Sequence, residues 1–132
     1  MSKTMIEKVD EVLETEVCAA DQKMINLFGR LNNRKHELMR EKKAKQEDLE
    51  KATDSQDDLF IADDDSKFKY SMGEAFLEVN KEDAESLIEK YINKLEEDIK
   101  KIDSDINDIN EKHKELKVIL YAKFKNSINL EE

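Results

Sequence analysis

The sequence predicts a mostly α-helical protein: a long antiparallel two-helix coiled coil whose helices are joined by one β-hairpin. Two periodicities indicate this fold, a heptad repeat of apolar residues in each half and a period of two between them. The composition agrees, because the 132 residues include two glycines, no proline, 42% charged residues and only 38% apolar residues. So few apolar residues are too little for an ordinary compact core.

The strongest repeat lies in residues 81–124. Apolar residues alternate there at spacings of three and four, which is the a/d seam of a coiled coil, and the residues between them are almost all polar. Asn80 is placed to cap the start of this helix. His113 occupies a core-facing position, where a polar residue typically sets register or partner choice at some cost in stability. The predicted core residues of this helix are Ile92, Leu95, Ile99, Ile102, Ile106, Ile109 and Leu116, and the seam continues through His113 to Leu120.

A weaker version of the repeat predicts a first helix over residues 20–58. Leu27, Leu31 and Leu38 are its predicted core residues. Arg34, Glu41 and Lys45 interrupt the seam. Residues 1–18 either extend this helix or fray for want of a partner of equal length, and residues 125–132 form a tail.

Between the helices the period changes to two, which predicts a β-hairpin over residues 67–79. Gly73 and Glu74 fit a two-residue turn with glycine first. Phe76 then points to one face, and the other face is wholly apolar. The predicted facing pairs on that apolar face are Met72 with Ala75, Tyr70 with Leu77, and Phe68 with Val79.

The hairpin predicts an oligomer. An isolated two-stranded hairpin is marginally stable in water, and two thin helices cannot cover its apolar face. We therefore expect equivalent hairpins of other subunits to bury it. At the helix ends away from the hairpin there are more apolar residues than one seam requires, which indicates a second protein-binding surface.

Charge and composition exclude several function classes. A net charge of −10 disfavours nucleic acid as a partner. The sequence contains no run of about 20 apolar residues, the length needed to span a membrane, and no secretory signal. A cytoplasmic protein is therefore expected. The charge is uneven, because residues 52–66 hold six aspartates and no basic residue, whereas residues 30–51 have a basic excess. The acidic run is interpreted as a solvated stretch that ends the helix.

No enzyme activity, metal or cofactor is predicted. The sequence holds no phosphate-binding glycine loop and no nucleophile motif, and a thin helical pair forms no water-excluding pocket. His36 and His113 lack a second ligand in a recognisable motif, and the aspartates at 63–65 lack the spacing of a calcium loop. Cys18, the one cysteine, is interpreted as an ordinary thiol.

Three stretches resemble the prefoldin family, and within it the β-type subunits of the subunit 4 group. They are DQKMINLFGRLNNR (21–34), LFIADDDSKFKYSMGEAFLEV (59–79) and LKVILYAKFKNSINLEE (116–132). The last is the most specific, because a coiled coil has no physical reason to end in LYAKF followed by INLE.

The resemblance implies a heterohexamer of two α-type and four β-type prefoldin subunits, assembled through hairpins that form β-barrels. It also implies an ATP-independent holdase of the cytosol that binds unfolded client proteins, notably actin and tubulin, at the coiled-coil tips and passes them to the group II chaperonin. The implied assembly contacts are Phe68, Tyr70, Met72, Phe76, Leu77 and Val79. The implied client contacts are Met24, Phe28, Leu120, Phe124 and Ile128. An architectural coiled-coil tether without holdase activity is the alternative, and it explains the heptads but not the hairpin.

Overall fold

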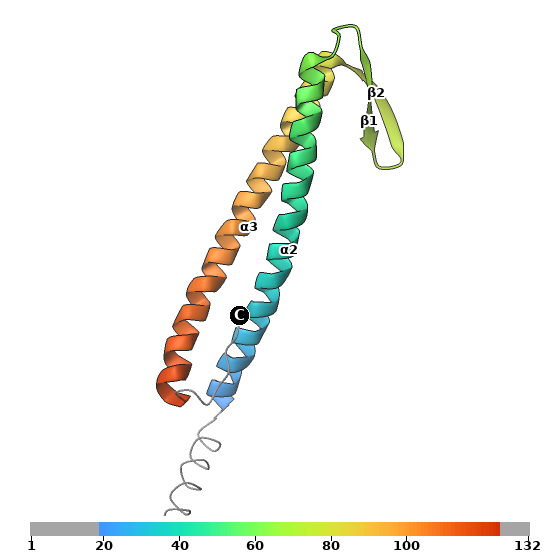
Figure 1. Ribbon diagram of the computed structural model, residues 1–132. Coiled ribbons are helices and arrows are strands. Elements are labelled where there is room, and N and C mark those ends of the chain that lie inside the picture. The colour runs from blue at the N-terminus through green and yellow to red at the C-terminus, as the bar shows by residue number, and fades with distance from the viewer. Residues whose placement is uncertain (1–18, 125–132) are drawn as a thin grey trace, which may run out of the picture. The chain divides into compact units, whose positions relative to one another are not determined.

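The computed structural model describes residues 19–124, with the side chain of Met72 left out. The order of elements is α2 (Ala19–Ile61), β1 (Lys67–Met72), β2 (Ala75–Asn80) and α3 (Lys81–Phe124) (Figure 1). The predicted fold class is confirmed, because two long helices flank one antiparallel hairpin. The sequence predicts helices over 20–58 and 81–124, so α2 continues three residues further than expected. The expectations for residues 1–18 and 125–132 lie outside the described residues.

The chain divides into two compact units. The hairpin unit is residues 39–104 and contains both strands, the end of α2 and the start of α3. The terminal unit contains, among the described residues, 19–38 of α2 and 105–124 of α3. In each unit the two helices run antiparallel: Lys42 pairs with Asp103 in the hairpin unit, and Asp21 pairs with Lys123 in the terminal unit.

The hairpin has the predicted register. Met72 faces Ala75, Tyr70 faces Leu77, and Phe68 faces Val79 across the antiparallel pair. Gly73 has a φ of +63°, the left-handed value that the first position of a two-residue hairpin turn requires. Glycine adopts this value without the steric cost that a Cβ would bring.

At several places the seam of α2 lies one residue away from the position that the sequence predicts for it. Arg34 and Glu41 are exposed, whereas the half-buried positions are Lys35 and Lys42. A lysine is tolerated in the seam because its aliphatic stem covers apolar neighbours while its ammonium reaches outward. With this correction α2 keeps alternating spacings of three and four without a break. Its buried or half-buried seam positions are Met24, Phe28, Leu31, Lys35, Leu38, Lys42, Lys45, Leu49, Ala52, Gln56 and Leu59.

Two lysines of this seam, Lys42 and Lys45, have acidic partners on α3. Within the hairpin unit, Lys42 Nζ lies 2.5 Å from Asp103 Oδ1, and Lys45 Nζ lies 3.4 Å from Asp98 Oδ2. The basic stretch of α2 is thus matched to an acidic stretch of α3. Such partly exposed pairs orient the two helices more than they stabilise them.

The seam of α3 follows the predicted positions. Ile99 and Ile106 are half-buried, and Leu27 of α2 is half-buried beside its own seam. Neither helix has a segment long and apolar enough to cross a membrane within residues 19–124. The buried seam residues of α3 are Ile92, Leu95, Ile102, Ile109, His113, Leu116 and Leu120.

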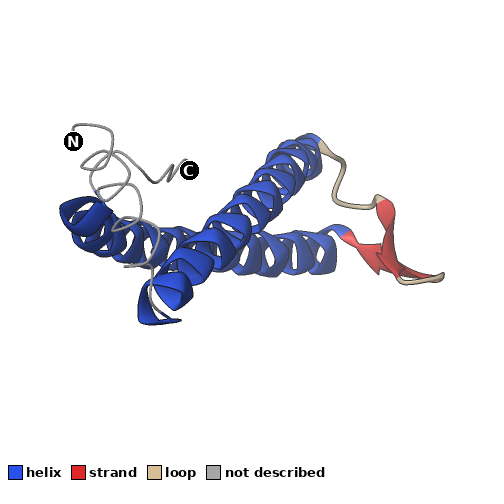
Figure 2. Ribbon diagram, turned by 90° about the horizontal axis from the view of Figure 1, so that it is seen from below, coloured by secondary structure: helices blue, strands red, loops and turns tan. Residues whose placement is uncertain are grey.

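The strand β2 passes directly into α3, as the colour change in Figure 2 shows. The side-chain Oδ1 of Asn80 accepts a hydrogen bond from the backbone N–H of Asp83 at 2.8 Å, which is the predicted N-cap. Glu82 and Asp83 lie in the first turn, where the helix dipole favours negative charge. Helix α3 therefore begins at a residue that also ends the hairpin.

Candidate functional site

The hairpin carries one candidate site, its apolar face. The facing pair Tyr70 and Leu77 remains 36% and 50% exposed. Phe76 points to the opposite face and is 69% exposed. Large apolar side chains left this open on two strands with unpaired edges are typical of a surface that another chain covers.

The base of the same face is covered by the helices. Val79 is only 8% exposed, and it packs with Leu59 at the end of α2 and Ala84 at the start of α3. Phe68 is half-buried against the same cluster. The expectation that the helices leave the whole face open is therefore wrong at its base, because both helix ends carry apolar residues that reach the hairpin.

Two adjoining hollows lie between the hairpin and the helices of this unit. One, of about 360 Å³, is lined by Phe68, Tyr70 and Val79 together with residues of both helices. The other, of about 410 Å³, extends along Tyr70 and Ser71 to Ala52 and Tyr91. Tyr70 borders both hollows, so it stands at the edge of a groove that is open to a neighbouring chain.

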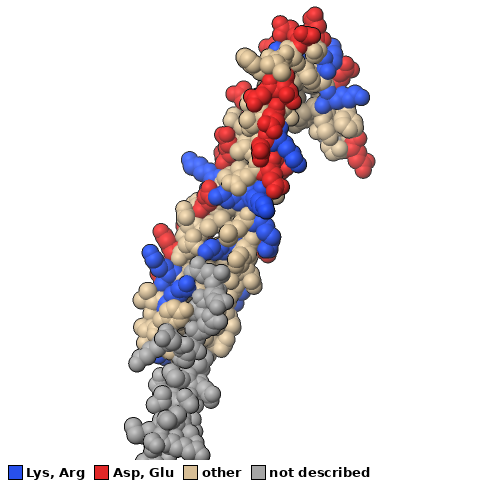
Figure 3. Space-filling view, in the orientation of Figure 1, with Lys and Arg blue, Asp and Glu red and all other residues tan. Residues whose placement is uncertain are grey.

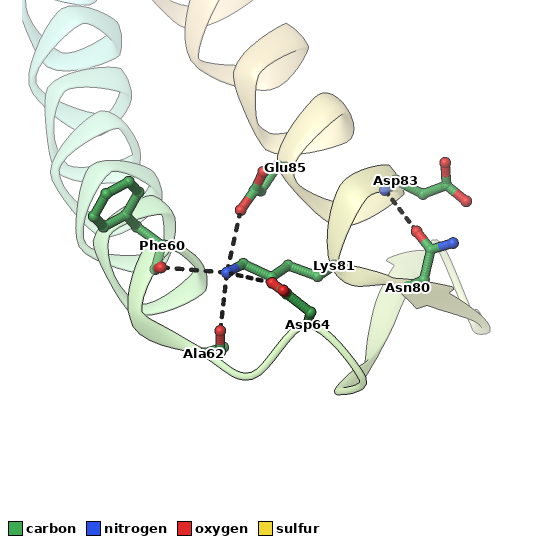
Figure 4. A network of polar contacts seen from close by, with 7 residues as sticks. All are labelled: Phe60, Ala62, Asp64, Asn80, Lys81, Asp83 and Glu85. Atoms are coloured by element: carbon green, nitrogen blue, oxygen red, sulfur yellow. Dashed lines mark hydrogen bonds and ion pairs between the residues drawn. The ribbon is translucent and has the colours of Figure 1, made fainter.

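Lys81 fixes the hairpin to the end of α2 (Figure 4). Its Nζ donates to the backbone carbonyls of Phe60 at 3.3 Å and Ala62 at 2.9 Å, and to Asp64 Oδ1 at 3.4 Å. The last turn of α2 contains no basic residue of its own, so the first residue of α3 supplies the cation that its carbonyl end favours. Glu85 Oε1 lies 4.0 Å from the same ammonium.

Sequence reasoning missed this role of Lys81. The residues that it joins lie 17 to 21 positions away, and no local pattern marks a lysine that caps a different helix. The exposure of Phe60 and Ile61, at 80% and 81%, was also not foreseen. They end α2 beside the acidic run.

The terminal unit holds a closed apolar cluster. Phe28 of α2 is 3% exposed and packs with Leu116, Leu120 and Phe124 of α3. The ring of His113 stacks on Phe28 with 4.2 Å between centroids, and its Nε2 lies 3.3 Å from the carbonyl oxygen of Phe28. Met24, Ile25, Leu27 and Leu31 pack around this core.

An ion pair joins the beginning of α2 to the end of α3 in the same unit. Lys123 Nζ donates to Asp21 Oδ2 at 2.7 Å, and Asp21 is 3% exposed. Asp21 also lies in the first turn of α2, where negative charge is favoured. The two helix ends are thus held together by a largely buried carboxylate.

The client contacts implied by the resemblance are mostly inside this cluster. Phe28, Leu120 and Phe124 are at most 3% exposed, Met24 is half-buried, and Ile128 lies outside the described residues. Ile25, Phe28 and Phe124 thus pack in or against the cluster instead of facing solvent. On the same part of α3 the exposed apolar residues are Val118, Ile119 and Tyr121, at 67%, 50% and 38%.

In the hairpin unit, the pKa values of two neighbouring side chains of α3, Lys94 and Asp98, depart from their ordinary values. The hydrogen bond from Lys94 is the main cause that lowers the pKa of Asp98 below its ordinary value, and the ammonium of Lys45 contributes. The same hydrogen bond raises the pKa of Lys94. Asp98 therefore takes part in a charge network between both helices.

The comparison with known families agrees with this arrangement of hairpin and helices. Residues 22–127 match the family model described as Prefoldin subunit. The chain belongs to the prefoldin family. It is 35% identical to human prefoldin subunit 4 over 132 residues, covering 99% of this chain and 97% of the relative.

Two further prefoldin subunits are similar to this chain over most of its length. The chain is 32% identical to prefoldin subunit 4 of Saccharomyces cerevisiae over 117 residues, covering 89% and 91% of the two chains. The crystal structure of the prefoldin beta subunit from Thermococcus strain KS-1 matches with a TM-score of 0.71 at 19% identity, covering 83% of this chain and 96% of that one. The latter match reflects the shared fold.

Proposed function

We propose that this prefoldin chain is a β-type subunit of a heterohexameric, ATP-independent holdase in the cytosol. In this role it binds unfolded proteins such as actin and tubulin and passes them to the group II chaperonin. The observation that carries the proposal is the open half of the hairpin face, Tyr70 and Leu77, beside an apolar groove. A coiled coil that served only as a tether has no use for such a face.

Assembly through the hairpin is supported by what the chain itself buries. The base of the face is anchored on Leu59 and Ala84, so the hairpin is held in place, while Tyr70 and Leu77 of its outer part stay 36% and 50% exposed. Burial of large apolar side chains contributes roughly 1.5–3 kcal/mol each. A neighbouring hairpin that covers Tyr70 and Leu77 on this face would therefore gain free energy that favours assembly.

Client binding is supported by the exposed residues of α3 in the terminal unit. Val118, Ile119 and Tyr121 lie outside the closed cluster and are accessible as it stands. Phe28, Leu120 and Phe124 become accessible only if the two helix ends separate, which requires the Asp21–Lys123 pair to break. We propose the exposed group as the first contact and the cluster as a second contact that opens with the client.

The assembly test uses a double substitution on the hairpin. Tyr70→Asp with Leu77→Asp places charge on the open part of the face and spares the anchored base. The mass of the complex formed with purified partner subunits should fall from hexamer to unassembled subunits, while helical circular dichroism stays unchanged. Formation of an intact hexamer by this variant would refute the assigned interface.

The client test uses the matched pair on α3, Ile119→Asp with Tyr121→Asp. This variant should assemble normally, but the complex should suppress aggregation of a denatured protein less well than the parent, in the absence of ATP. Unchanged suppression would show that these residues are not client contacts. If the parent complex assembles and suppresses no aggregation, the chain acts as an architectural coiled coil.

A further inference from the structure

The negative charge of the protein is concentrated at one place, the hairpin end, which we define as residues 54–90. This segment holds twelve acidic and four basic side chains, a net charge of −8 out of −10 for the whole chain. It includes the last turns of α2, the linker, the hairpin and the first turns of α3. Figure 3 shows acidic side chains gathered over the region where α2 ends and α3 begins.

These carboxylates are solvent-exposed and lie mainly on the helix ends and in the linker next to the hairpin, because residues 67–80 hold two acidic and two basic side chains. All twelve acidic residues of the hairpin end are exposed except Glu85, which is half-buried, and the side chain of Asp64 is 96% exposed. Within the same segment Phe60, Ile61 and Phe76 are 80%, 81% and 69% exposed. The hairpin end therefore combines exposed apolar side chains with a large net negative charge.

This combination has opposite consequences for two kinds of partner. If a second copy of this chain covered the hairpin, two segments of net charge −8 would meet at an interface, and their repulsion opposes the apolar gain. A chain with excess lysine and arginine gains the same apolar burial and an attraction as well. Complementary charge also accelerates encounter.

We propose that the charge of the hairpin end selects the neighbouring subunit: it excludes a second copy of this chain and admits a different chain whose own hairpin end is net basic. This inference rests on the proposed assembly through the hairpin, and adds to it the chemistry of the partner. The apolar face supplies the affinity, and the carboxylates of the adjoining helix ends and linker supply the selectivity.

The first test measures self-association of the isolated chain. The parent should be monomeric at low salt, roughly 0.02 M, and should self-associate at roughly 0.5 M, because the screening length falls to a few ångströms at such concentrations. Sedimentation would show the change in mass. If the mass of the parent does not change between roughly 0.02 M and 0.5 M salt, the proposal is overturned, because screening the charges has then not led to self-association.

The second test removes the charge directly and has a matched control. The hairpin-end variant neutralises three exposed carboxylates, one on α2, one in the linker and one in the turn: Asp57→Asn, Asp65→Asn and Glu74→Gln. The control variant neutralises three exposed carboxylates of α3 in the terminal unit: Asp108→Asn, Glu111→Gln and Glu115→Gln.

Both variants change the net charge of the chain by the same amount. At low salt the hairpin-end variant should self-associate about ten-fold more tightly than the parent, and the control should behave as the parent does. Equal behaviour of the two variants would overturn the proposal, because position would then not matter. Adding Tyr70→Asp and Leu77→Asp to the hairpin-end variant should return it to a monomer.

The third test uses two purified prefoldin subunits, one with a net basic hairpin segment and one with a net acidic segment. The basic subunit should associate with the parent faster as salt is lowered, and the acidic one should not. Salt-independent association with both would refute the selection by charge and leave assembly through the hairpin intact. Failure to associate with either would refute the proposed function instead.

Discussion

The terminal unit and the hairpin unit are built on the same two helices, yet they treat their apolar residues differently. In the terminal unit Phe28, Leu116, Leu120 and Phe124 are at most 4% exposed, because each helix covers the other. In the hairpin unit Leu77 is half exposed, because a two-stranded sheet offers a face wider than the helix ends can cover. The seam core of the first unit closes within one chain, whereas the hairpin face of the second stays partly open.

The contrast separates stability from assembly. A residue buried within the chain contributes to the stability of the isolated subunit, whereas a residue on an open face contributes when a partner arrives. Substitutions in the two units should therefore be distinguished by different measurements.

The largest effect is expected for Leu120→Ala in the terminal unit. Leu120 is 0% exposed, so its truncation leaves a cavity and should cost about 2–5 kcal/mol of unfolding free energy. Leu77→Ala in the hairpin unit should leave the denaturation midpoint of the isolated chain nearly unchanged. If chemical denaturation shows equal losses for both variants, the contrast between the two units is wrong.

Lys81→Met should have the next largest effect, in the unit that assembles. It removes the charged hydrogen bonds to the carbonyls of Phe60 and Ala62, at a cost of about 1–2 kcal/mol. It should also weaken assembly, because the hairpin loses a link to the end of α2. Lys90→Met, an exposed lysine of the same helix, is the control and should change neither the denaturation midpoint nor the mass of the complex.

Replacing each of the two glycines by alanine should change the stability of the chain in opposite directions. Gly73→Ala forces a side chain into a φ of +63° and should cost about 1 kcal/mol. Gly29 is exposed in α2 and a Cβ there meets nothing within 4 Å, so Gly29→Ala should raise the stability by about 0.5–1 kcal/mol. Thermal unfolding of both variants measures the pair. Two shifts of the same sign would contradict this assignment.

The smallest effect is expected from Asp98→Asn, and it should depend on pH. Since the hydrogen bond from Lys94 lowers the pKa of Asp98, the carboxylate contributes stability above its unfolded value of 3.8. That contribution is lost as the pH falls through the lower folded value. The parent should thus be slightly more stable than the variant at neutral pH, and the difference should vanish in acid. A difference that grows in acid would refute the shift.

Local patterns made much of the hairpin unit predictable from the sequence. The register follows from alternation around Gly73, and the cap at Asn80 depends on residues three positions apart. The link from Lys81 to the end of α2 was not predictable, because it joins residues that only the folded chain brings together. The cover over Val79 was missed for the same reason.

The terminal unit shows a different limit of sequence reasoning. Apolar residues in excess of one seam were interpreted as an exposed surface, but Phe28 and Phe124 lie inside the cluster. Phe28 is a seam position of α2 and Phe124 continues the buried stripe of α3 after Leu120, so neither residue is in excess of the seam. Lys45 of α2 gave a similar difficulty, since it reads as an interruption of the seam until its partner Asp98 is known.

The contact between His113 and Phe28 has a further consequence for the terminal unit. A seam of leucine and isoleucine repeats every seven residues, so sliding one helix by a heptad exchanges aliphatic contacts of similar size. After such a slip Ile106 or Leu120 would occupy the place of His113, and the imidazole would lose both the aromatic ring and the carbonyl oxygen that it meets now. One imidazole thus marks a single alignment of the two helices, because the neighbouring heptad frames offer it neither contact.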